Sequence, residues 1–356
     1  MATGERDIAP SYARAIRTVA TEKEIPDIAT LQARFRARKL SPLDVVEACL
    51  KQIEQVNPKL NAFITVLPEQ ALEQAQIAEG EMKAGKWRGP LHGIPVGIKD
   101  FYDTEGVRTT AGFEDFVNRV PKKDAAGVAK LREAGAVIVG KTNMHRLGMG
   151  TTGLESAFGP VRNPWNADYI AGGSSSGSAA AVATGMCFAT LDTDAIGSCR
   201  LPAACCGVVG FKGTYGLISP KGILEGEADP GEMIRCFSHP GIMARCVEDV
   251  AIVLDVLVDR TQNDGLRYLE TMRNNVELRV GVASNFEADQ EVCRAFQAAV
   301  EQIRGLGYST RNVAAPLHHP VNDTSKIETD RRSIFPMRFT TSMSLFFRRP
   351  SPPFQP

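Results

Sequence analysis

The sequence predicts an α/β fold in which helices cover both faces of a central sheet. Segments with helical periodicity alternate along the chain with short apolar segments that have the length of strands. This alternation is typical of a sheet whose two faces are both buried under helices. The composition agrees with such a fold, because 43% hydrophobic and 23% charged residues are ordinary values for a globular protein.

Two helices are predicted near the start of the chain. The first spans about 27–38, where apolar residues recur on one face. The second has a clear beginning, because Ser41 fits an N-cap, a proline follows it, and Asp44 completes a capping box. We expect Asn57 and Pro58 to end this helix, since proline disrupts a helix interior.

The following elements alternate between strand and helix. The predicted strands are 62–66, 93–100, 137–139 and 278–283, and the predicted helices are 71–83, 124–134, 247–258 and 289–306. We divide the chain into a loose lead-in at 1–25, one domain at 26–315 and an atypical tail at 316–356. The end of the tail is rich in proline and has no period, so we expect no packed element there.

Charge and composition exclude several classes of function. The chain has 41 basic and 41 acidic side chains. It therefore shows no excess of positive charge that would bind nucleic acid or an acidic membrane surface. No apolar run approaches the ~20 residues of a membrane span, and no secretory signal opens the chain, so a cytoplasmic location is expected. The eight cysteines and five histidines show no zinc spacing. We therefore expect no metal and no cofactor.

A glycine- and serine-rich segment is the first candidate for chemistry. Residues 171–178 read Ala-Gly-Gly-Ser-Ser-Ser-Gly-Ser and precede an alanine-rich run. By itself the segment fits a turn that opens a helix, an anion-binding helix N-terminus, or a catalytic serine loop. It lacks the lysine of a P-loop and the glycine order of a dinucleotide-binding loop.

Further blocks in a fixed order favour the catalytic interpretation. They are Gly-Ile-Pro-Val-Gly-Ile-Lys-Asp at 93–100, Gly-Lys-Thr-Asn-Met at 140–144, Phe-Gly-Pro at 158–160, Asn-Pro-Trp at 163–165, and Thr-Asp-Ala-Ile-Gly-Ser-Cys-Arg at 193–200. With the serine segment, these blocks resemble the amidase signature family over roughly residues 25–310. The resemblance implies a mixed central sheet and hydrolysis of a small-molecule carboxylic amide.

The resemblance also implies a catalytic triad of Lys99, Ser174 and Ser198. Ser174 would lie in a cis peptide, and Ser198, 24 residues further on, would be the nucleophile. In this mechanism Ser198 attacks the amide carbonyl, and its proton passes through Ser174 to Lys99. Lys99 must then be neutral, which requires burial to lower its pKa from ~10.4.

The loop around the nucleophile supplies the remaining candidates. The expected oxyanion hole consists of the backbone N–H groups of Ala195, Ile196, Gly197 and Ser198. Asp194 and Arg200 are expected to hold this loop, by pairing with each other or with the backbone. Beside Ser174, Gly173 lowers the steric cost of a cis bond, and Ser175 is expected to support the site through a hydrogen bond.

Two departures from the family pattern bear on function. Ile196 stands where the family has a small residue, so this loop should either adopt an ordinary backbone conformation or be strained. The side chain is expected to narrow the acyl pocket. Residues 316–356 do not resemble the family's C-terminal part, so we expect that part of the fold to be incomplete.

Three functions remain open from the sequence. A free-standing amidase that releases ammonia is favoured. The first alternative is the A subunit of a glutamyl-tRNA amidotransferase, which hydrolyses glutamine for a tRNA-bound partner, although residues 222–239 look unlike the glutamine site of such subunits. The second alternative is a truncated, inactive remnant. The sequence leaves the substrate and the oligomeric state open, a homodimer included.

Overall fold

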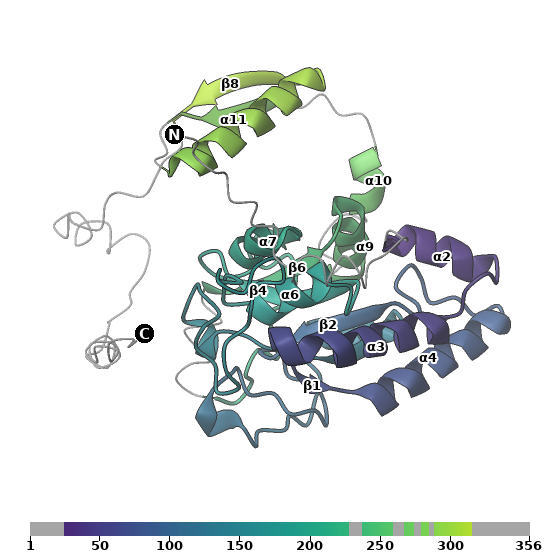
Figure 1. Ribbon diagram of the computed structural model, residues 1–356. Helices are drawn as coiled ribbons and strands as arrows, with labels where there is room; N and C mark the ends of the chain where they lie inside the picture. Colours follow the sequence, from purple (N-terminus) through teal and green to yellow (C-terminus); the bar gives the residue numbers. More distant parts are fainter. Residues whose placement is uncertain (1–24, 228–236, 259–266, 274–278, 285–287, 315–356) are drawn as a thin grey trace, which may run out of the picture. The chain divides into compact units, whose positions relative to one another are not determined.

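The computed structural model describes residues 25–227, 237–258, 267–273, 279–284 and 288–314 (Figure 1). The predicted lead-in before residue 25 and the predicted tail after residue 315 lie outside these residues. The chain divides into two compact units, Met1–Asn274 and Asn275–Pro356. All of the predicted site residues belong to the first unit.

The first unit is built on a six-stranded sheet of mixed direction. Its strands, in the spatial order β1, β3, β2, β4, β6 and β5, are Phe63–Val66, Val137–Thr142, Pro95–Lys99, Ala189–Asp194, His239–Ala244 and Val209–Lys212. Strand β2 runs parallel to both β3 and β4, while β1, β6 and β5 pair antiparallel with their neighbours. The predicted α/β fold with a mixed central sheet is therefore confirmed.

Helices cover both faces of this sheet, as predicted. Among the described residues of the first unit, the α-helices are α2 Ile28–Arg36, α3 Pro42–Leu60, α4 Pro68–Lys83, α5 Ala126–Glu133, α6 Ser176–Ala183, α7 Arg200–Cys206, α9 Val247–Leu257 and α10 Tyr268–Arg273. Short 3₁₀ turns at Glu114–Phe116 and Arg146–Gly148 interrupt the loops. Along β3, Ile138 belongs to a core cluster with α2, α5 and α9, whereas Val137 and Val139 belong to a second cluster with α4, α6 and α7. Alternate side chains of the strand thus enter two separate cores.

Helix α3 shows both a confirmed and a wrong prediction. The Ser41–Asp44 capping box is present, with both reciprocal hydrogen bonds. The expected end at Pro58 is wrong, because the helix continues to Leu60 and ends where Asn61 adopts a left-handed conformation. Pro58 lies in the last turn, so the helix loses only one backbone hydrogen bond there. The side chain of Asn57 also pairs with the backbone of the following strand.

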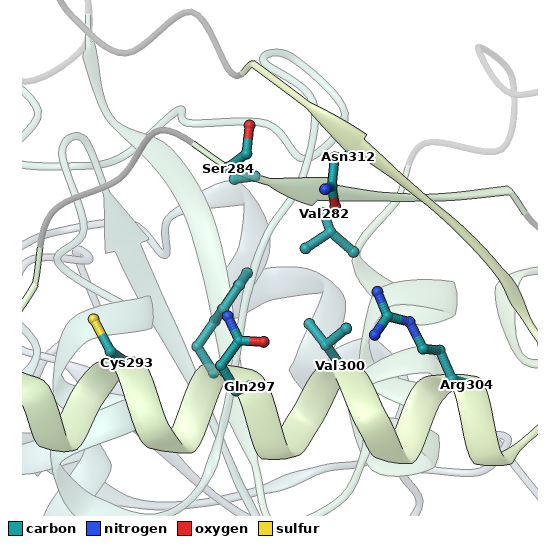
Figure 2. Close-up of a pocket in the computed structure, with 9 residues that line it drawn as sticks. Val282, Ser284, Cys293, Gln297, Val300, Arg304 and Asn312 are labelled. Atoms are coloured by element: carbon teal, nitrogen blue, oxygen red, sulfur yellow. The ribbon is translucent and has the colours of Figure 1, made fainter.

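Within its described residues, the second unit has two parallel strands and one helix. Strands β7, Arg279–Ala283, and β8, Ser309–Val313, pair along their length, and α11 spans Gln290–Gly305. A pocket of about 390 Å³ lies between the helix and the strands. Cys293, Gln297, Val300 and Arg304 project from the helix toward Val282 on β7 (Figure 2). None of the predicted site residues lines this pocket.

Two glycines in different helices make a matched pair for a stability test. A β-carbon on Gly177 would lie 2.6 Å from the amide nitrogen of Asn143 and closer still to the carbonyl oxygen of Ala62. We expect Gly177→Ala to destabilise the protein by about 3 kcal/mol, since the obstructing atoms are backbone. Gly80 lies in α4 with open space around it, so Gly80→Ala should stabilise by about 0.5–1 kcal/mol. Urea unfolding of both variants measures the two changes, and equal effects would contradict this packing.

Candidate active site

Lys99 is the last residue of β2 and is completely buried. Its ammonium donates hydrogen bonds to the hydroxyl of Ser174 at 2.8 Å and to the hydroxyl of Thr193 at 2.7 Å. Burial disfavours the charged form and lowers the pKa of Lys99 to about 8, against the opposing effect of nearby carboxylates. With the pKa near 8 rather than at its ordinary value, a minor fraction of this amine is neutral near neutral pH and is able to accept a proton.

Ser174 lies two residues before the start of α6, and the peptide bond between Gly173 and Ser174 is cis. The carbonyl of Ser174 accepts a hydrogen bond from the backbone N–H of His145 at 2.9 Å. No side chain would fit on Gly173, because a β-carbon there would lie 2.9 Å from the carbonyl oxygen of Gly150. Close backbone packing on both sides therefore fixes the position of the Ser174 hydroxyl against Lys99.

Ser198 lies in the loop between β4 and α7 and is almost fully buried. Its carbonyl accepts a hydrogen bond from the backbone N–H of Ser175 at 3.0 Å, which holds the two serine segments together. The Ser175 hydroxyl donates weakly to the carbonyl of Thr193, at 3.4 Å. Among the hydrogen bonds of the described residues, none joins the hydroxyls of Ser174 and Ser198. The structure thus places Ser198 beside the Lys99–Ser174 pair through the backbone.

Asp194, at the end of β4, organises the loop that carries Ser198. Its carboxylate accepts hydrogen bonds from the guanidinium of Arg200 at 2.9 and 3.0 Å and from the backbone N–H groups of Gly197, Cys199 and Arg200. Although burial opposes it, this set of donors holds the pKa of Asp194 far below its usual range. The pairing of Asp194 with Arg200 that the sequence suggested is present.

The expected oxyanion hole needs one correction. The N–H of Gly197 donates to Asp194 at 2.8 Å, so in this structure it does not face a substrate. The N–H groups of Ala195, Ile196 and Ser198 remain as candidates, and none of them has a hydrogen-bond partner among the described residues. Ile196 has no positive φ, and its side chain is 83% exposed. Gly197 adopts the unusual conformation instead, with a φ of 135°.

Three residues near the site were missed or given no role by sequence reasoning. Thr193 is the second partner of Lys99, and its only signal was its place directly before Asp194. Asp192 is buried on the same strand and acts electrostatically on Lys99. His145, which has no partner nearby in the sequence, contacts Ser174 through its backbone. Only the pairing of distant strands brings these residues together.

The described residues contain neither a metal-binding cluster nor a membrane span. Within them, no group of three or more histidine, cysteine, aspartate or glutamate side chains could hold a metal ion. No helix in the described part of the chain is both long and apolar enough to cross a bilayer.

The fold places the chain in a class of α/β proteins that includes solved amidases. The chain belongs to the amidase family, whose model matches residues 44–334. It is 40% identical over 297 residues to the A subunit of the glutamyl-tRNA(Gln) amidotransferase of Geobacter metallireducens, covering 80% of this chain and 60% of that protein. It is 45% identical over 244 residues to the mitochondrial A subunit from Ixodes scapularis, covering 67% of this chain and 47% of that protein.

A solved structure shows the same fold. The peptide amidase of Stenotrophomonas maltophilia superposes with a TM-score of 0.69 at 33% identity, over 82% of this chain and 62% of that one. This chain therefore spans less than two thirds of the length of the relatives it matches.

Proposed function

We propose that the protein hydrolyses a carboxylic amide through an acyl-enzyme on Ser198. The observation that carries this proposal is the hydrogen bond of a fully buried Lys99 to Ser174, in a segment whose backbone also binds the Ser198 segment. A buried, partly neutral lysine is a base, and a hydroxyl bonded to it can pass a proton from a second hydroxyl.

The steps balance without any further group. Ser198 Oγ attacks the amide carbon while its proton moves to Ser174 and the Ser174 proton moves to Lys99. The carbon–nitrogen bond then breaks, and the proton returns by the same path to the leaving nitrogen, which departs as ammonia. Water repeats the cycle on the acyl-enzyme and releases the acid. The N–H groups of Ala195, Ile196 and Ser198 are the candidates to bind the oxyanion.

The sequence relatives bear on which amide is cleaved. The sequence analysis favoured a free-standing amidase, but the matched curated relatives are A subunits of glutamyl-tRNA amidotransferases. These relatives support the glutaminase alternative better than the peptide amidase supports a free-standing enzyme, since the identity to the latter is lower, at 33%. Glutamine is therefore the substrate that we propose first, with simple amides second. The sequence objection concerned residues 222–239, and 228–236 of these lie outside the described residues.

Ammonia release distinguishes the candidates. Purified protein is incubated with glutamine and, separately, with a panel of simple amides, with the Ser198→Ala variant as control. We expect the wild-type chain to release ammonia from glutamine and the variant to release none. Release from simple amides only would favour the free-standing amidase. Equal inactivity of both proteins on the whole panel, with no fluorophosphonate labelling of Ser198, would support the inactive remnant and contradict the proposal.

A further inference from the structure

Asp192 is a buried carboxyl group beside Lys99 to which the proposed reaction gives no role. Strands β2 and β4 are parallel, and their register pairs Ile98 with Leu191. The next pair in this register is Lys99 and Asp192. Paired residues of adjacent strands project from the same face of a sheet, so both side chains lie on one face, and both are completely buried.

The carboxylate of Asp192 is only partly satisfied. One oxygen, Oδ2, accepts a hydrogen bond from the hydroxyl of Thr190 at 2.5 Å. The other, Oδ1, is buried and has no hydrogen-bond partner among the described residues. Burial raises the pKa of Asp192, against the opposing effects of Ser178, Thr190 and the ammonium of Lys99. An acceptor left without a donor is costly in a protein interior. After the hydroxyls of Ser178 and Thr190, the ammonium of Lys99 is the next group that favours the carboxylate form of Asp192.

The other charged groups around Lys99 have partners of their own. Asp192 is the strongest influence that favours the ammonium form of Lys99, followed by the Cys199 thiol and Asp194. Asp194, however, is already bound by Arg200 and backbone N–H groups and has Lys212 at 3.6 Å. The imidazole of His145 also interacts electrostatically with Lys99, and it lies near the carboxylate of Glu155.

Asp100 provides an internal comparison. It follows Lys99 directly in the chain and is equally buried. Neighbouring residues of a strand point to opposite faces, and Asp100 instead lies 3.5 Å from the ammonium of Lys141 and binds Thr110. Proximity in sequence therefore does not couple Asp100 to Lys99, whereas the sheet register couples Asp192 to it.

We infer that Asp192 is a positioning residue that sets the proton affinity of Lys99. The inference rests on the proposed function for its catalytic consequence. A carboxylate beside the amine keeps Lys99 protonated to a higher pH, and it also stabilises the ammonium that forms when Lys99 takes the serine proton. Removing its charge should lower the pH at which the site becomes active and should slow the reaction at high pH, because the base is then weaker.

The test is the pH dependence of fluorophosphonate labelling of Ser198 in wild type, Asp192→Asn and Asp100→Asn. In wild type the labelling rate rises with pH as Lys99 loses its proton, and we call this rise the acidic limb. In Asp192→Asn we expect the acidic limb to move to lower pH by about one unit. The labelling rate on the plateau at high pH should fall several-fold. Asp100→Asn should leave the limb in place. A merely structural role for Asp192 would lower the rate without moving the limb, and that outcome would overturn the inference.

A second measurement separates this inference from the proposed function. The ζ-nitrogen of Lys99, observed by NMR in lysine-labelled protein, should titrate at lower pH in Asp192→Asn than in wild type. If wild type never labels at Ser198 but this shift occurs, the proposed function fails and the role of Asp192 stands. If wild type labels and the Lys99 titration is unchanged, the inference fails alone. Should Asp192→Asn not fold, Thr190→Val tests the same point, with a smaller shift in the same direction.

Discussion

Replacing Lys99 by methionine should slow acylation of Ser198 by about 10²–10⁴-fold, the usual contribution of a general base. Methionine keeps the length and apolar volume of the buried stem, but it offers no atom that can take the proton from Ser174. The rate constant for labelling by a fluorophosphonate measures the loss directly. Thermal unfolding of the same preparation should show that the variant remains folded.

The pH profile identifies the titrating lysine. Neutral Lys99 is the reactive form, so in wild type the labelling rate should rise with pH through about 8, where its pKa lies, and then level off. Lys141 is equally buried, and its pKa is also lowered by burial to about 8. Lys141→Met is therefore the matched control and should keep this rise, whereas Lys99→Met should lose it. A rise that disappears in Lys141→Met and persists in Lys99→Met would refute the assignment of the base.

Removing the carboxylate of Asp194 should have the second-largest effect. In Asp194→Ala the backbone N–H groups of Gly197, Cys199 and Arg200 lose their acceptor, and Arg200 loses its ion-pair partner. We expect a loss of about 3 kcal/mol in the free energy of unfolding. Labelling of Ser198 should fall at least ~10²-fold, because a misplaced nucleophile is costly. Urea unfolding and labelling kinetics measure the two effects.

Acid pH provides the control for Asp194. Its pKa in the folded state lies well below the value of ~3.9 expected in the unfolded chain. Its stabilising contribution is therefore fully present above about pH 4 and is lost as pH falls toward the folded pKa. The stability difference between wild type and Asp194→Ala should be largest near neutral pH and should shrink below pH 4. A difference that does not depend on pH would show that packing, not charge, holds the loop.

Several features could be predicted from the sequence because they depend on interactions between residues a few positions apart. The capping box at Ser41 and Asp44 involves residues three positions apart, so the sequence contains the whole interaction. The pairing of Asp194 with Arg200 also joins residues in one loop. The end of α3 could not be predicted in the same way, because Asn57 there bonds the backbone of the strand that follows, beyond the helix.

The features of the site can be sorted in the same way, into those that the sequence indicated and those that depend on the fold. The resemblance of the ordered sequence blocks to the amidase signature family was enough to single out Lys99, Ser174 and Ser198 as candidates. The blocks could not reveal that Thr193 binds Lys99, because that contact depends on three-dimensional geometry. They indicated that Asp194 holds its own loop, but not that the N–H of Gly197 is one of its donors.

The sequence by itself determined the alternation of helices and strands and the helix starts, since each depends on groups a few positions apart. The resemblance of its blocks to the amidase signature family supplied the candidate residues. Only the tertiary structure decided which polar groups meet in the interior. Lys99 and Asp192 are 93 residues apart in the sequence, and they become neighbours because two parallel strands pair in one particular register. A shift of that register by one residue would turn one of the two side chains to the opposite face of the sheet.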